Sequence, residues 1–321
     1  MMRRVIVTGG AGFIGSHLTH RLLTSADEVV AVDDLSTGSA DNLDPAVALV
    51  RGDIRDEALM DRVAQGADCI YHLAASVSVA ASIADWRRAH EINLTGTLGV
   101  FHAAARHGVP VVYASSAAVY GNHPEPCDET ARPLPISPYG ADKLGCEHHA
   151  GAMAVVHGLR SIGLRFFNVY GPGQGRGSPY SGVISLFLRN RLADRPHVVF
   201  GDGRQSRDFV HVSDVVNGLV RAGDRLRCAG SPMAEVFNIC SGNGTDILTL
   251  AAMLDRVSNG PAIDPVHRPA NPGDIRFSQG IFRAAEAAFG YRPETALADG
   301  LAELWRLESG RSAPSPNGST G

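Results

Sequence analysis

The feature that most constrains the fold of this chain is a glycine-rich turn near its start. An apolar run at residues 5–7 has the character of a buried strand, and a helical pattern runs from residue 13 to about residue 23. Between them stand Gly9, Gly12 and Gly15, spaced three apart. Glycines at this spacing permit a tight turn and let the backbone approach a pyrophosphate, which the helix N-terminus attracts. The pattern predicts a β-α-β unit that binds a dinucleotide.

Strand and helix patterns continue to alternate through the first half of the chain. Further strands are predicted at residues 29–32, 47–50, 69–73, 111–114 and 161–166, and further helices at about 89–107 and 140–157. Strands separated by helices form parallel β-α-β units. We therefore expect an α/β fold with a Rossmann-type doubly wound parallel sheet and a smaller C-terminal substrate-binding lobe.

An acidic residue ends the second predicted strand and indicates which dinucleotide binds. Asp33 follows Gly15 by 18 residues. A carboxylate at this place accepts hydrogen bonds from a ribose diol and repels a 2′-phosphate, which favours NAD over NADP. The alternative for Asp33 and Asp34 is an ordinary turn after a strand.

The expected domain boundaries follow from these patterns. Residues 1–168 are predicted to form the NAD-binding Rossmann domain, and residues 169–308 the substrate-binding lobe, with a strand near 235–240 that returns to the large domain. Residues 309–321 are rich in Ser, Gly and Pro and carry no apolar anchor, so we expect a disordered tail.

A single lysine stands among 28 arginines, and its position is informative. Lys143 lies four residues after Tyr139. This spacing puts both side chains on one face of a helix, one turn apart. A compact ammonium beside a phenol stabilises the phenolate, which then acts as a base. The alternative is that compositional bias removed the other lysines and one survived by chance on a solvated helix face.

Composition and charge argue against several classes of partner. The formal net charge is −4, and the arginines are scattered among acids without a basic stripe, so we expect no nucleic-acid partner. The apolar runs are too short to cross a bilayer and the chain starts directly with a strand, so we expect a cytoplasmic protein with no membrane partner. The five cysteines lack metal-type spacing, which predicts reduced thiols and no metal site.

Taken together, the motifs resemble those of the extended short-chain dehydrogenase/reductases, in the nucleotide-sugar epimerase/dehydratase group. The resemblance covers nearly all of the chain except the tail. It is strongest to the UDP-glucose/UDP-galactose 4-epimerase branch. It rests on residues 8–15, 53–56, 72–75, Asn93, 115–121, 139–143, 165–172 and 201–214, which stand in the family's order. The resemblance also implies a homodimer, built through helices at about 90–107 and 140–157.

The resemblance implies a role for each matching residue. The catalytic residues would be Ser116, Tyr139 and Lys143. The NAD-binding residues would be Gly9, Gly12, Phe13, Ile14, Gly15, Asp33, Asp34, Thr37, Gly38, Asp53, Ile54, Leu73, Ala74, Ala75, Asn93, Tyr139, Lys143 and Phe166. The substrate, a UDP-sugar, would be bound by Ser116, Tyr139, Asn168, Arg207, Asp274 and Ser278.

The two residues after Ser116 separate the branches of the family. The dehydratases that the chain resembles carry an Asp-Glu pair there, and the decarboxylases carry Glu in the second place. This chain has Ala117 and Ala118. Because a methyl group cannot transfer a proton, the resemblance favours simple 4-epimerisation through a transient 4-keto sugar. We predict an isomerase that acts on UDP-glucose and UDP-galactose.

The substrate remains open at this point. Ser278 matches the position whose bulk decides whether an N-acetyl group fits, and serine is small. Asn271 stands where the family usually has a phosphate-binding arginine, and Arg176 could pair with a uronate. The alternatives are therefore a UDP-glucuronate 4-epimerase, another 4-keto nucleotide-sugar enzyme such as an atypical dehydratase, or a catalytically silent dinucleotide sensor on the same fold.

Overall fold

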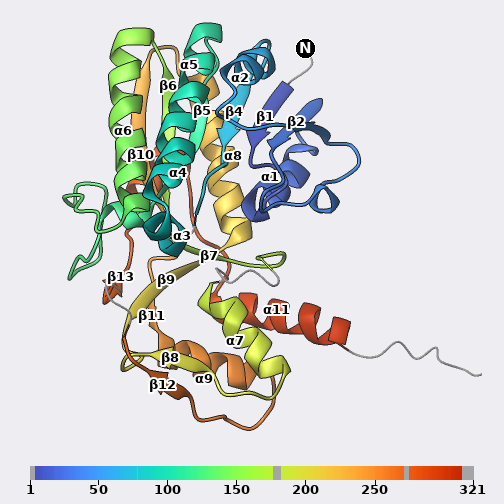
Figure 1. The fold of residues 1–321 in the computed structure, drawn as a ribbon, viewed down its shortest axis with the longest axis vertical. Helices are drawn as coiled ribbons and strands as arrows, with labels where there is room; N and C mark the ends of the chain where they lie inside the picture. Colours follow the sequence, from blue (N-terminus) through green and yellow to red (C-terminus); the bar gives the residue numbers. More distant parts are fainter. Residues whose placement is uncertain (1–3, 78, 176–181, 271–274, 313–321) are drawn as a thin grey trace, which may run out of the picture.

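The computed structural model describes residues 4–77, 79–175, 182–270 and 275–312, and a seven-stranded sheet organises most of them (Figure 1). Its strands are β1 (Arg4–Thr8), β2 (Glu28–Asp33), β3 (Ala48–Arg51), β4 (Cys69–His72), β5 (Val111–Ser116), β6 (Arg160–Phe166) and β10 (Met233–Ile239). They lie in the order β3-β2-β1-β4-β5-β6-β10, and every neighbouring pair is parallel. This is the strand order of a Rossmann fold, so the predicted fold class is confirmed.

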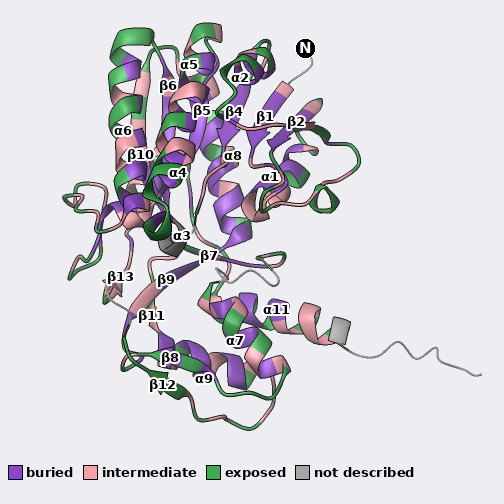
Figure 2. Cartoon of the chain, viewed as in Figure 1, coloured by how far each residue is buried: buried purple, intermediate pink, exposed green. Residues whose placement is uncertain are grey.

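Helices cover both faces of this sheet. One face packs against α1 (Phe13–Leu22) and α8 (Val212–Cys228), and the other against α2 (Glu57–Ala64), α5 (Thr97–His107) and α6 (Pro138–His157). Alternate residues of β1 serve the two cores, since Val5 and Val7 belong to one and Ile6 to the other. The strands β1, β2, β4, β5 and β6 are mostly buried, as Figure 2 shows, which is why they read as apolar runs, whereas the edge strand β3 is largely exposed.

The helix predicted at 89–107 is interrupted in the structure. It consists of α4 (Trp86–His90), a π-helical turn (Glu91–Gly96) and α5. The Thr97 hydroxyl donates to the carbonyl oxygen of Asn93 at 2.6 Å, while the Asn93 side chain is drawn away to the backbone of Ser76. The periodic pattern did not reveal this turn because the turn depends on a contact with a distant segment.

The second part of the chain forms a smaller lobe below the sheet in Figure 1. Its strands are β7 (Asn168–Tyr170), β9 (Ser206–His211), β11 (Gly244–Asp246) and β13 (Phe277–Ser278) in one small sheet, and β8 (Val198–Phe200) with β12 (Val266–Arg268) in another. Its helices are α7 (Val183–Leu192), α9 (Ile247–Val257) and α11 (Leu297–Ser312), which enclose a third apolar core.

The chain passes between the large sheet and the smaller lobe more often than the predicted boundaries allow. Besides β10, the helices α8 and α10 (Arg283–Phe289) pack against the large sheet or its covering elements, so the lobe is not a continuous stretch from 169 to 308. Helix α11 continues to Ser312, so residues 309–312 are helical where the sequence predicted disorder. Hydrophobic contacts of residues such as Leu301 and Leu304 with the third core hold this helix.

The remaining short elements are 3-10 turns at Ala40–Asn42 and Ala117–Val119 and the helix α3 (Val79–Ala84). In the part of the chain that the structure describes, no helix is long and apolar enough to cross a membrane. Within the same residues, no cluster of three or more histidine, cysteine or acidic side chains could hold a metal ion.

Candidate active site

The glycine turn between β1 and α1 is shaped to approach a ligand closely. Gly9 has φ +69°, and a Cβ at Gly15 would lie 2.0 Å from the Gly9 carbonyl oxygen, so neither position accepts a side chain without a shift of the backbone. Gly12 is the N-cap of α1, and no side chain caps this helix. The first backbone N–H groups of α1, at Phe13 and Ile14, therefore face an anion site that a pyrophosphate fits.

Asp33 lies at the end of β2 beside this turn. Its two carboxylate oxygens accept from the N–H of Ala11 at 3.0 Å and from the N–H of Leu35 at 2.8 Å. Each oxygen retains a lone pair, so the carboxylate is oriented and still able to accept from a ribose diol. The following loop, with Asp34, Thr37 and Gly38, folds back on the turn, since a Cβ at Gly38 would lie 2.7 Å from the Ala11 carbonyl oxygen.

The three catalytic candidates meet where β5 ends and α6 begins. Lys143 is 2% exposed, its Nζ donates to the carbonyl oxygen of Ala114 at 2.8 Å, and it lies 5.8 Å from the ring centre of Tyr139. Ser116 ends β5, and its Oγ accepts from the N–H of Ala118 at 3.1 Å. The structure thus places a buried ammonium and a half-buried phenol at the start of α6 and an oriented hydroxyl at the end of β5.

The start of α6 is fixed on the turn that follows Ser116. Ser137 caps the helix by accepting from the N–H of Gly140 at 3.1 Å. A Cβ at Gly140 would lie 2.5 Å from the carbonyl oxygen of Ala118, so the first helical turn packs directly against that turn. Glycine at 140 is therefore what lets the first turn of α6, which carries Tyr139, pack against the turn that follows Ser116.

Sequence reasoning gave no role to His72, yet the histidine lies at the centre of a buried hydrogen-bond chain. Its Nδ1 pairs with the Thr8 hydroxyl at 2.7 Å and its Nε2 with the Thr97 hydroxyl at 2.9 Å. Because the Thr97 hydroxyl donates to Asn93, Nε2 must carry the proton and Nδ1 must accept from Thr8. Burial and then the charge of Lys143 lower the pKa of His72 to about 3, so the ring is neutral.

Asn93 orders the segment after β4. Its side chain bonds both backbone groups of Ser76, at 2.8 and 3.1 Å, and this holds the run that contains Leu73, Ala74 and Ala75. Its carbonyl oxygen also bonds α6, since it accepts from the Cys146 thiol at 3.3 Å. Asn93 is thereby bonded both to the segment after β4 and to α6, the helix that carries Tyr139 and Lys143.

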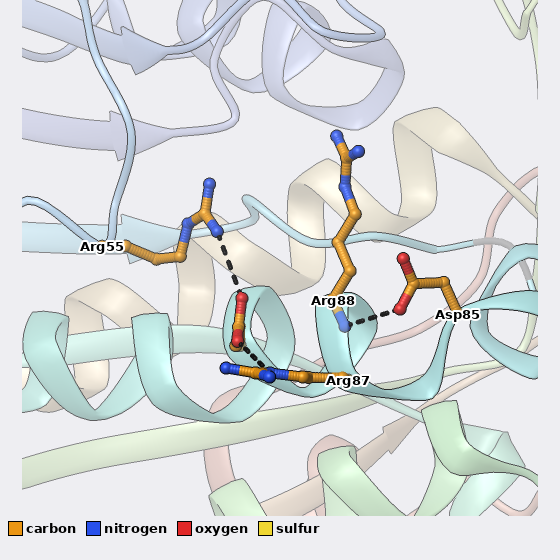
Figure 3. A pocket seen from close by; sticks show the side chains of 5 residues that line it. Arg55, Asp85, Arg87 and Arg88 are labelled. Carbon is orange, nitrogen blue, oxygen red and sulfur yellow. Dashed lines mark hydrogen bonds and ion pairs between the residues drawn. The ribbon is translucent and has the colours of Figure 1, made fainter.

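Asp53 and Ile54, two of the predicted NAD-binding residues, follow β3 at the edge of the large sheet. Ile54 is buried, and Asp53 pairs with Arg55 at 2.5 Å, a hydrogen bond that lowers the pKa of the Asp53 carboxyl. Next to them is an open pocket of about 560 Å³, drawn in Figure 3. It is lined by Arg55, Asp85, Arg87, Arg88 and Glu91. None of the catalytic candidates lines it, so it lies outside the site described above.

Three of the predicted substrate residues are brought together on the small sheet. Ser278 stands in register with Arg207, and Asn168 with Phe209, two residues further along β9. Arg207 is anchored by bonds from its Nη1 to the carbonyl oxygens of Ser206 and Ile275, at 2.9 and 2.6 Å.

Other predicted residues are placed by the large sheet or lie beyond the described chain. Phe166 ends β6 in register with Ser116, so it adjoins the catalytic candidates. Asp274, together with Asn271 and Arg176, lies outside the residues that the structure describes. The described candidates thus fall into two groups, one at the carboxyl ends of the large sheet and one on the small sheet.

The chain matches known proteins over nearly its full length. Residues 5–240 match the model of the NAD dependent epimerase/dehydratase family. The chain is 37% identical to a UDP-glucose 4-epimerase of Mycolicibacterium smegmatis, covering 94% of this chain and 96% of that protein. It is 35% identical to a dTDP-glucose 4,6-dehydratase of Streptomyces niveus, covering 94% and 91%.

The fold has an equally clear counterpart among solved structures. A UDP-glucose 4-epimerase of Thermotoga maritima, solved with UDP-glucose, superposes with a TM-score of 0.89 at 34% identity, covering 96% of this chain and 98% of that one. The family model alone matches more than half of the chain, and the glycine turn and Asp33 fit the dinucleotide. The chain belongs to the NAD-dependent epimerase/dehydratase family of extended short-chain dehydrogenases/reductases, and its cofactor is NAD.

Proposed function

We propose that this protein is an NAD-dependent UDP-sugar 4-epimerase that interconverts UDP-glucose and UDP-galactose. The observation that carries the proposal is the pair Ala117 and Ala118, which follow Ser116 in the 3-10 turn at the active site. Two methyl groups stand where elimination of water from the sugar would need an acid and a base. Because the chain is similar to both epimerases and dehydratases, this difference supports the epimerase branch.

The catalytic candidates supply the proton chemistry of such a reaction. Tyr139, as a phenolate, takes the proton from the C4 hydroxyl of the sugar, and Ser116 hydrogen-bonds the same oxygen. Lys143 stabilises the phenolate and, with the donors that its bond to Ala114 leaves, binds the nicotinamide ribose. When bound, NAD supplies the hydride acceptor and donor for the sugar C4. Tyr139 then returns its proton after the 4-keto sugar has presented its other face.

The lobe supports binding of the nucleotide diphosphate. Arg207 has the planar fork of donors that phosphate oxygens prefer. Ser278 is its partner on the small sheet, and Asn168 pairs two residues further along β9. Asp274 is proposed to bind the uridine ribose. Serine at 278 leaves room for an acetamido group, so we propose that N-acetyl sugars are also accepted, within a preference of about 10–200-fold.

Two further parts of the proposal concern the whole protein. We propose a homodimer that packs α5 and α6 against their copies, because Val155 and Val156 on α6 are 87% and 70% exposed. A cytoplasmic location remains a prediction from the sequence.

The test is an assay of the purified protein without added NAD. UDP-glucose, UDP-galactose, their N-acetyl forms and UDP-glucuronate are each incubated with it, and the products are separated by anion exchange and weighed by mass spectrometry. We expect a C4 epimer of unchanged mass. A product lighter by one water or one carbon dioxide would contradict the proposal, and turnover of UDP-glucuronate alone would replace it with a uronate epimerase.

A further inference from the structure

Glu147 and Arg165 form a buried ion pair beside the catalytic candidates that has no part in the mechanism above. Arg165 donates from Nε and Nη2 to the two carboxylate oxygens, at 2.9 and 2.7 Å. The two side chains are 7% and 4% exposed. A fully desolvated ion pair stabilises a fold only when its geometry is good. Removal of one partner leaves the other charge buried without a counter-charge. Its place in the fold therefore matters more than its contribution to stability.

Glu147 lies one helical turn after Lys143, and the two residues fasten α6 to consecutive residues of β5. Lys143 donates to the carbonyl oxygen of Ala114 at 2.8 Å, and the Ser115 hydroxyl donates to Glu147 Oε1 at 2.5 Å. The next residue of β5 is Ser116. These two contacts set the position of α6 along β5, and so the position of the helix-borne catalytic candidates relative to Ser116.

From Arg165 the network continues to the segment that carries Ser278. Arg165 Nη1 donates to the Tyr120 hydroxyl at 2.8 Å, and that hydroxyl donates to Asn238 Oδ1 at 2.7 Å. Asn238 Nδ2 then donates to the carbonyl oxygen of Ile281 at 3.1 Å. Every bond in this chain runs in the same direction, so the groups polarise one another. Ser278 lies three residues before Ile281.

We propose that Glu147 and Arg165 are positioning residues. They keep the catalytic candidates and the Ser278 segment in a fixed position relative to one another. This rests on the proposed function, because a 4-epimerase must retain its keto sugar while the sugar turns and must then meet it again with the same groups. Misplacement of a reacting group by about 1 Å costs about 10²-fold in rate. A pair that joins β5, α6, β6 and, through Tyr120 and Asn238, the segment after β13 prevents that movement.

A variant in which the catalytic candidates and the Ser278 segment move relative to one another should differ chemically from a variant that is only less stable. If the keto sugar leaves before it is reduced, the sugar has given its hydride to NAD and its proton to Tyr139, and the protein is left with reduced nicotinamide. Electrons and protons balance, since the sugar is oxidised and the nicotinamide reduced by the same two electrons. A variant in which Glu147 and Arg165 no longer fix these positions should accumulate protein with reduced nicotinamide during turnover.

The experiment compares Glu147→Gln, Ser115→Ala and Tyr120→Phe with wild type at a temperature where all are folded. The control is Glu235→Gln, which in the same way removes the carboxylate charge from a half-exposed pair with Arg225 (2.8–3.1 Å) nearer the start of β10. We measure kcat and KM for the sugar nucleotide and, by nicotinamide fluorescence, the fraction of protein left with reduced cofactor. The three variants should lose about 10–10²-fold in kcat with little change in KM and should accumulate the reduced form, while the control behaves as wild type.

Two results would overturn the inference. One is wild-type kcat and cofactor state in the three variants, and the other is a loss of kcat and accumulation of reduced cofactor in the Glu235→Gln control equal to theirs. Should Glu147→Gln fail to fold, the milder Ser115→Ala and Tyr120→Phe decide by the same readouts. A wild-type protein that turns over no nucleotide sugar would instead overturn the proposed function and this inference with it.

Discussion

At the scale of single residues, the one lysine of the chain is the sharpest test of the site. Lys143 is buried, and its ammonium bonds Ala114 close to the Tyr139 ring. A guanidinium is larger and spreads its charge, so Lys143→Arg should fold but lose about 10²-fold or more of kcat. Kinetics and a melting curve check this, with exposed Arg306→Lys as the control. Full turnover in Lys143→Arg would remove the lysine from the mechanism.

A second residue-scale prediction concerns His72 and pH. Its pKa is about 3 in the folded chain, because burial and then the charge of Lys143 disfavour the imidazolium, against about 6.5 when unfolded. Between these values the unfolded state binds a proton that the folded state does not. The contribution to stability is therefore complete above pH 6.5 and is lost as the pH falls.

The size of this effect can be measured by urea unfolding. Between pH 7 and pH 5 the free energy of unfolding should fall by about 2 kcal/mol more in wild type than in His72→Gln, which keeps a polar side chain but cannot titrate. His197 and His211, whose pKa values burial also lowers, are present in both proteins and cancel. Equal pH dependence in the two proteins would show that His72 titrates normally.

At the scale of elements, the start of helix α6 links stability to catalysis. The Ser137 side chain caps this helix by accepting from the N–H of Gly140, and the first turn that it caps carries Tyr139. Ser137→Ala should cost about 1 kcal/mol and lower kcat several-fold, because the first turn frays. Asp246→Ala, which removes the cap of α9 in the lobe, should cost a similar amount of stability and leave kcat unchanged. Equal kcat in the two capping variants would contradict this link.

Elements also show what the sequence could predict and what it could not. The glycine turn, Asp33 and the Tyr139–Lys143 spacing were predictable because each signal lies within one short segment. The π-helical turn and the bonds of Asn93 to Ser76 were not, since they arise between segments 17 residues apart. Glu147 and Arg165 were missed for the same reason, because they meet only after α6 packs on β6.

At the scale of the whole molecule, the repeated crossing of the chain makes its two parts interdependent. A fragment of residues 1–168 would keep the predicted Rossmann domain but lose α8, which covers one sheet face, and β10, which covers the β6 edge. We expect this fragment to bind a hydrophobic dye and to unfold without a cooperative transition, as circular dichroism would show. A fragment that unfolds cooperatively and binds NAD would restore the boundary predicted from the sequence.

A 4-epimerase oxidises the sugar at C4 and reduces it again at C4 within one site. The most direct measurement uses UDP-glucose that carries deuterium at C4, incubated with the purified protein, with the position of the label in the product read by nuclear magnetic resonance. We expect UDP-galactose with deuterium still at C4 and none exchanged with water. Deuterium found at C6 of a product that has lost water would mean that the protein is a dehydratase despite Ala117 and Ala118, and would contradict the account.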